Sequence, residues 1–84
     1  MYEVIFSREA VKGLERTTTP MKRRVIRALE GLKADPLKGK RLRGELEGLF
    51  SLRIGGMRAV YEVDAERRAI VIHAVEPRGD VYKS

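Results

Sequence analysis

The chain has 84 residues, enough for one small domain with a single hydrophobic core. Eighteen Lys and Arg against 12 Asp and Glu give a net charge of +6, which favours a polyanionic partner such as nucleic acid. The absence of Cys and the single His exclude disulfides and the usual zinc ligand sets. The N-terminus, MYEVIFSREA, lacks a signal-peptide pattern, and no apolar run is long enough to span a bilayer. We therefore expect a cytoplasmic domain that uses no metal or other cofactor and no membrane.

The first half of the chain predicts one strand followed by two helices. Residues 2–6, YEVIF, are β-branched and aromatic and predict a short strand, and Ser7 is a suitable N-cap for the first helix. Thr19 and Pro20 fit the N-cap and first position of a second helix, which stops by Asp35-Pro36. One face of the second helix is apolar, with Met21, Val25, Ala28, Leu29 and Leu32. Its opposite face is basic, which is typical of a solvated face and also suits a general contact with nucleic acid.

The second half predicts three consecutive strands. Residues 37–48 form an irregular charged connection that Leu37 and Leu42 are expected to anchor to the core. Strands are expected near residues 49–54, 57–64 and 69–76, joined by turns at Gly55-Gly56 and at residues 64–68. The predicted fold is α+β in the order β-α-α-β-β-β, with a mainly antiparallel sheet and two helices packed on one face.

A two-residue loop at Gly55-Gly56 fixes the pairing of the first two of these strands. It places Arg53 opposite Arg58. One face of the hairpin is then apolar, with Phe50, Leu52, Ile54, Met57, Ala59 and Tyr61, and the other has Ser51, Arg53, Arg58 and Val60. Two like charges in opposition cost about 0.2–1 kcal/mol. Either Glu62 or Glu76 neutralises them in a structural ion pair, or a phosphate does. We favour the open anion site, because Arg78 and Tyr82 follow the last strand closely.

His73 is the only histidine and therefore a candidate proton carrier. It lies within AIVIHAV, which reads as a strand buried on both faces. We expect a packed, hydrogen-bonded structural residue and keep its imidazole as a reserve general base.

Three segments together, LRGELEGLFSLRIGGMRAVYEV, AIVIHAV and PRGDVYK, resemble the RelE branch of the RelE/ParE superfamily of toxin–antitoxin toxins. The resemblance implies a RelE-like, microbial-ribonuclease-like fold with a twisted sheet. It also implies a metal-independent endoribonuclease that cleaves messenger RNA in the ribosomal A site. In such enzymes the RNA 2′-hydroxyl attacks the adjacent phosphorus, so cations must stabilise developing negative charge.

By position, the resemblance implies catalytic roles for Arg58, Arg78, Tyr82 and Arg53. The RNA-binding residues would be Arg53, Ser51, Arg43, Arg41 and Lys40. Ser51 is a departure, because some relatives have Lys at this place. The general base therefore stays open between Tyr82 and the carboxylates of Glu45 and Glu47, with His73 in reserve.

The resemblance also implies a partner. A cognate RelB-like antitoxin is expected to bind the toxin in a hetero-oligomer, and either to cover the face bearing Arg53 and Arg58 or to displace the tail around Tyr82. Two alternatives stay open: a ParE-like inhibitor of DNA gyrase on the same fold, and a catalytically silent RNA-binding relative.

Overall fold

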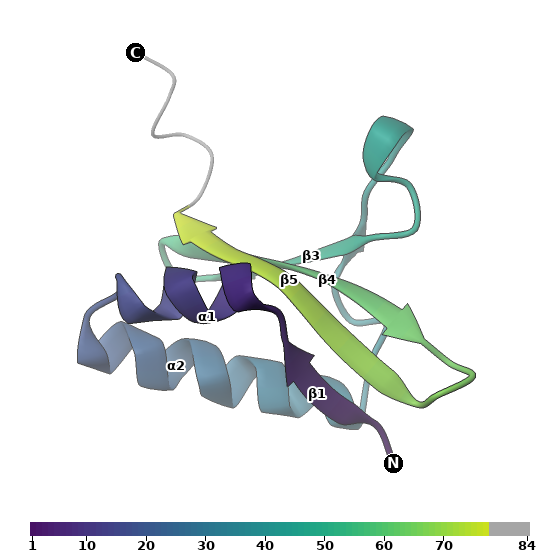
Figure 1. Cartoon of the computed structure of the whole chain (residues 1–84), viewed down its shortest axis with the longest axis horizontal. Helices are drawn as coiled ribbons and strands as arrows, with labels where there is room; N and C mark the ends of the chain where they lie inside the picture. Colours follow the sequence, from purple (N-terminus) through teal and green to yellow (C-terminus); the bar gives the residue numbers. More distant parts are fainter. Residues whose placement is uncertain (78–84) are drawn as a thin grey trace.

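The computed structural model describes residues 1–77, which form two helices and a five-stranded mixed sheet (Figure 1). The strands lie in the order β1-β5-β4-β3-β2, with β1 parallel to β5 and every other pair antiparallel. The elements are β1 (Glu3–Phe6), α1 (Arg8–Glu15), α2 (Thr19–Glu30), the 3₁₀ helix η1 (Gly31–Lys33), β2 (Lys40–Arg41), the 3₁₀ helix η2 (Gly44–Leu46), β3 (Phe50–Ile54), β4 (Met57–Asp64) and β5 (Ala69–Pro77). The α+β prediction is confirmed.

The sequence predicted a wholly irregular connection before β3, but the structure has regular elements there. Its two-residue strand β2 pairs with the start of β3. Leu37 was expected to anchor this connection, yet its side chain is 56% exposed. The phenol of Tyr61 holds the loop instead: it donates to the Pro36 carbonyl and accepts from the Gly39 N–H, both at 2.9 Å. Leu42 is half-buried, so polar contacts to a buried ring replace only the Leu37 part of the predicted apolar anchor.

The helix starts follow local capping. Ser7 caps α1 as predicted, since its Oγ accepts a hydrogen bond from the Ala10 N–H at 3.1 Å. For α2 the N-cap is Thr18 rather than Thr19, and its side chain makes no capping bond. The helix begins one residue earlier than expected, because the Lys22 N–H donates to the Thr18 carbonyl at 2.8 Å, and the fixed φ of Pro20 still suits its place in the first turn.

The hydrophobic core lies between the two helices and one face of the sheet (Figure 1). The predicted stripe of α2 supplies Val25 and Leu29, both fully buried, and the sheet supplies Tyr61, Ile70 and Ile72. No helix within residues 1–77 is long and apolar enough to cross a membrane.

Helix α1 touches the backbone of β5 at Gly13. A Cβ atom at this position would lie 2.0 Å from the Val75 carbonyl oxygen, so only glycine fits. This close approach fixes α1 against β5.

The β3–β4 hairpin has the predicted register. Arg53 pairs with Arg58 and Phe50 with Tyr61, and Gly55 has a φ of 58°, which a tight turn accepts most easily from glycine. The apolar face of the hairpin points to the helices as expected. We call the opposite side of the sheet, which neither helix covers, the open face.

The β4–β5 pairing contains a β-bulge. The register shifts between Val60 and Tyr61, and His73 on β5 is left without a partner. The His73 side chain is 42% exposed, and its Nε2 lies 2.7 Å from Glu62 Oε1. The predicted hydrogen bond is present, but the expectation that this strand is buried on both faces is wrong, since the helices cover only one face.

Candidate phosphate-binding site

The open face gathers basic side chains from three neighbouring strands. The register places Arg53 beside Arg58, and β2 places Lys40 directly beside Ser51. Residues in direct opposition point to the same face of a sheet, so all four side chains lie on the open face. Four of the residues predicted to contact RNA or a phosphate are thereby brought together, and Lys40 supplies an ammonium group next to Ser51.

Arg58 is neutralised by a residue of β5. Its Nη2 donates to Oε2 of Glu76, which pairs with it across β4–β5, and the two side chains are 36% and 41% exposed. The other predicted carboxylate, Glu62, binds His73 instead. The structural ion pair that the sequence left as an alternative is therefore present at Arg58, and no salt bridge within residues 1–77 includes Arg53.

Arg53, Arg58 and Glu76 form a row across β3, β4 and β5, which we call the charged row. Adjacent strands are about 4.8 Å apart, so the three side chains are within reach of one phosphodiester group. The Nε of Arg58 is buried and has no hydrogen-bond partner within residues 1–77, so Glu76 uses only part of the donor capacity of the guanidinium.

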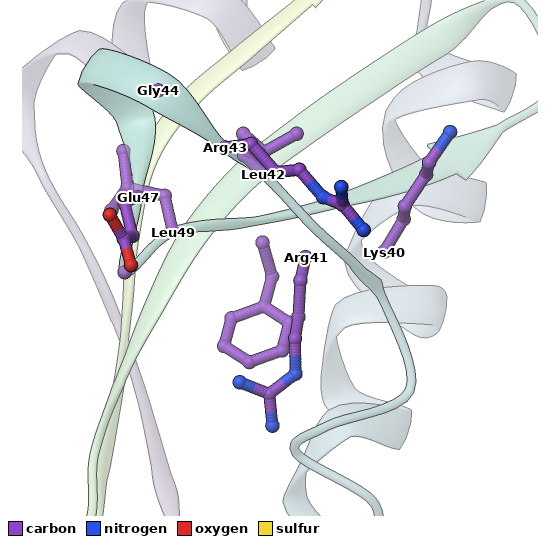
Figure 2. A pocket seen from close by; sticks show the side chains of 9 residues that line it. Lys40, Arg41, Leu42, Arg43, Gly44, Glu47 and Leu49 are labelled. Carbon is purple, nitrogen blue, oxygen red and sulfur yellow. The ribbon is translucent and has the colours of Figure 1, made fainter.

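A second set of predicted residues lies in a hollow beside β2 and η2. Figure 2 shows Lys40 and Arg41 pointing to opposite sides of β2, while Arg43 and Glu47 also line the hollow. The Arg41 guanidinium carbon is 5.4 Å from the centre of the Phe50 ring, a cation–π contact. Arg41 is therefore placed apart from the charged row and stacks on the helix-facing side of β3.

Tyr61 connects this hollow to the core. Its ring stacks on Phe50 with centroids 5.3 Å apart, and its hydroxyl holds the loop that leads to Lys40. Burial raises the pKa of the Tyr61 phenol above its ordinary value, the hydrogen bond from Gly39 opposes the shift, and the charge of Asp35 adds to it. The phenol therefore stays neutral and keeps both hydrogen bonds at physiological pH.

A third group of cations lies around the end of β3 that does not pair with β2. Arg24 and Arg27 of α2, Lys38 of the loop and Arg53 line one hollow in which no carboxylate takes part. The Arg24 guanidinium lies against the β3–β4 turn, where a Cβ on Gly55 would be 3.0 Å from its Nη1. Part of the basic face of α2 is thereby continuous with the open face through Arg53.

The remaining predicted residues are separated from this site. Glu45 and Glu47 lie on and beside η2, which projects from the end of the sheet where β3 begins (Figure 1). Arg78 and Tyr82 lie outside the described residues. The sequence offered Glu62 and Glu76 alike as ion-pair partners of the two arginines, and the pairing of β4 with β5 selects Glu76. Within residues 1–77, no three His, Asp or Glu side chains converge to hold a metal ion.

Comparisons with known proteins agree on one family. A family model described as "ParE toxin of type II toxin-antitoxin system, parDE" matches residues 4–82. Toxin RelG of Mycobacterium tuberculosis is 37% identical over 84 residues, covering 98% of this chain and 97% of that protein.

Two solved structures have the same fold and a related sequence. The RelBE2 toxin–antitoxin complex from Mycobacterium tuberculosis contains a chain that is 35% identical, with a TM-score of 0.86 over 92% of this chain and 98% of that one. An archaeal RelE–RelB complex from Pyrococcus horikoshii contains a chain that is 26% identical, with a TM-score of 0.76 over 93% and 96% of the two chains. The relatives carry RelE-type names, which favours the RelE-like interpretation over the ParE-like one. The chain belongs to the RelE/ParE superfamily and is a RelE-like toxin of a type II toxin–antitoxin module.

Proposed function

We propose that this toxin is a metal-independent endoribonuclease of the cytoplasm. It cleaves messenger RNA in the A site of the ribosome and so inhibits translation. The observation that supports this most is the pair Arg53 and Arg58, side by side on the open face. Lys40 and Ser51 occupy the adjacent positions on the same face. A phosphodiester is the ligand that suits such a concentration of planar and point-like cations.

The chemistry that fits is attack of the RNA 2′-hydroxyl on the neighbouring phosphorus. The transition state adds negative charge to the phosphoryl oxygens, and fixed cations stabilise that charge more than they stabilise the ground state. Arg53 and Arg58 take this role, while Arg78 and Tyr82 are proposed to complete the site from the C-terminal segment.

The test is cleavage of a defined message in a purified translation system. The 5′ ends of the products are mapped for the wild type and for Arg58→Gln, Arg53→Gln, Arg78→Ala and Tyr82→Phe. The wild type is expected to cleave only when ribosomes are present. The variants are expected to yield no cleavage products. Arg67→Gln is the matched control, because Arg67 lies in the β4–β5 turn at the other end of β4 and its side chain is 84% exposed.

Two results would contradict the proposal. Intact messages together with gyrase-dependent DNA breaks would identify a gyrase inhibitor on the same fold. RNA binding without any cleavage by the wild type would identify a catalytically silent relative.

We also propose that a RelB-like antitoxin neutralises the toxin in a hetero-oligomer. The relatives in the RelBE2 and RelE–RelB structures are in complexes of this kind, and the net charge of +6 suits an acidic partner. The antitoxin is expected to cover the open face. Co-purification of the two proteins tests the partnership, and protection of Arg53 and Lys40 from chemical modification in the complex tests the location. If both side chains react equally in the free and bound toxin, the antitoxin binds elsewhere.

A further inference from the structure

We infer that Glu76 is the general base that accepts the proton of the attacking 2′-hydroxyl. This inference rests on the proposed endoribonuclease function and assigns a role that the sequence left open.

Glu76 lies beside the two arginines that are proposed to bind the phosphate. It is the carboxylate of the charged row, in direct contact with Arg58 through Oε2. A phosphate bound between Arg53 and Arg58 therefore has this carboxylate one strand away, about 4.8 Å across the sheet. A general base must lie within hydrogen-bond reach of the proton that it takes, and a 2′-hydroxyl is only a few bonds from its phosphorus.

Oε1 of the Glu76 carboxylate makes no hydrogen bond within residues 1–77. The only hydrogen-bond contact of the carboxylate in this part of the chain is the one from Arg58 to Oε2, and the side chain is 41% exposed. Oε1 is thus available to a hydroxyl donor, while the bond to Arg58 fixes the orientation of the carboxylate. An ionised carboxylate accepts on both oxygens, so the two contacts are compatible.

The other described candidates are less well placed. Glu47 precedes β3, and the first residue of β3 is already three residues, about 10 Å, from Arg53. His73 lies three residues, about 10 Å, along β5 from Glu76, and its Nε2 contacts Glu62 rather than a residue of the charged row. Lys40 is closer, beside Ser51, but an ammonium group has no lone pair with which to accept a proton.

The proposed step transfers one proton and exchanges one phosphorus–oxygen bond for another. Glu76 takes the proton from the 2′-hydroxyl, and the 2′ oxygen forms a bond to phosphorus. The bond from phosphorus to the 5′ oxygen breaks, and the 5′ oxygen leaves with the electron pair and is protonated by water. Glu76 then returns its proton to solvent, and the products are a 2′,3′-cyclic phosphate and a free 5′-hydroxyl.

A different role for the same contact makes the opposite prediction. If Glu76 only occupies Arg58 until substrate arrives, it competes with the RNA phosphate. Its removal would then raise both RNA affinity and cleavage rate. A general base, in contrast, contributes about 10²–10⁴-fold to the rate of the chemical step.

The experiment compares Glu76→Gln with the wild type in single-turnover cleavage of a message on programmed ribosomes. The amide oxygen of Gln still accepts a hydrogen bond from Arg58 but is not a base. Affinity is measured separately with a 2′-O-methyl RNA, which cannot be cleaved. Glu62→Gln is the matched control, since it removes a carboxylate from the same face of β4, four residues from Arg58.

We expect Glu76→Gln to lower the cleavage rate at least about 100-fold, with RNA affinity little changed and a normal thermal unfolding transition. In the wild type the single-turnover cleavage rate should rise with pH through the acidic range. In Glu76→Gln this rise should be absent. Glu62→Gln should cleave like the wild type.

Three outcomes overturn the inference while leaving the ribonuclease function intact: wild-type rates in Glu76→Gln, faster cleavage with tighter RNA binding, or an unchanged pH profile. Failure of the proposed function is distinct, because the wild type itself would then produce no cleavage.

Discussion

Replacement of Tyr61 by Phe tests how the fold supports the basic face. The Tyr61 hydroxyl donates to the Pro36 carbonyl and accepts from the Gly39 N–H, both at 2.9 Å. The ring is fully buried and stacks on Phe50. The Tyr61→Phe variant keeps the ring and its stacking but leaves two backbone groups of the loop without their partner.

The expected loss of stability follows from these two hydrogen bonds. Each contributes about 0.5–1.5 kcal/mol net, so the free energy of unfolding should fall by about 1–3 kcal/mol. In a chain of this size 1 kcal/mol corresponds to roughly 4–8 °C in Tm. The loop also leads to β2, so the variant should hold Lys40 less firmly and bind RNA more weakly.

Urea unfolding followed by circular dichroism measures the change. Tyr2→Phe is the matched control, because the Tyr2 hydroxyl makes no hydrogen bond within the described part of the chain. A loss in Tyr61→Phe below about 0.5 kcal/mol, or equal to that of the control, would refute the argument that the hydroxyl anchors the loop.

Because the pKa of Tyr61 is raised in the folded chain, the free energy of unfolding should depend on pH, and the direction of the change can be stated. Below about pH 10 the phenol is protonated in the folded and unfolded chains, and the stabilisation is complete. Above that value the unfolded chain loses the proton first, so stability falls as pH rises through the folded pKa. The difference between wild type and Tyr61→Phe should therefore narrow above about pH 10, and a difference that stays constant would contradict the shift.

Three further variants have expected outcomes. Gly13→Ala should cost roughly 3 kcal/mol, since its Cβ would lie 2.0 Å from the Val75 carbonyl oxygen, and urea unfolding should show it. Gly31→Ala, with φ of −64° and no atom near its Cβ, should instead stabilise the chain by about 0.4–1 kcal/mol in the same assay. Arg53→Gln should reduce the salt dependence of 2′-O-methyl RNA binding by about 0.7 in log–log slope, whereas Arg67→Gln should leave it unchanged.

The central pair of the site was predictable because a hairpin has few degrees of freedom. A two-residue loop at Gly55-Gly56 determines every cross-strand pair of β3 and β4, and the alternation of faces then follows. The adjacency of Arg53 and Arg58 was therefore determined by spacing alone. The core stripe of α2 was predictable for the same reason, since apolar residues recur at a helical period.

Strand β2 was not predictable from the sequence. It has only two residues, Lys40 and Arg41, within a charged, glycine-containing segment, so it has no period to detect. Its pairing with β3 depends on the loop that Tyr61 holds, which is a contact between residues more than 20 positions apart. The position of Lys40 beside Ser51 thus depends on tertiary structure rather than on local preference.

The bulge at His73 decides which residue faces Arg58. Between Asp64 and Tyr61, β4 pairs with β5 in one register. If that register continued without a shift, Val75 would lie opposite Arg58 and Glu76 would face the core beside Met57. The extra residue moves the rest of β5 by one position, which keeps Val75 in the core at 4% exposure and puts Glu76 on the open face.

The sequence holds a trace of this shift, because two residues without large apolar side chains, His73 and Ala74, separate Ile72 from Val75 where strict alternation allows one. The bulge is also fixed by the start of α1. The Ser7 hydroxyl donates to the carbonyl of His73 at 3.0 Å while it caps the helix. The N-cap of the first helix therefore stabilises the register that brings Glu76 to Arg58, and with it the geometry on which the proposed proton transfer depends.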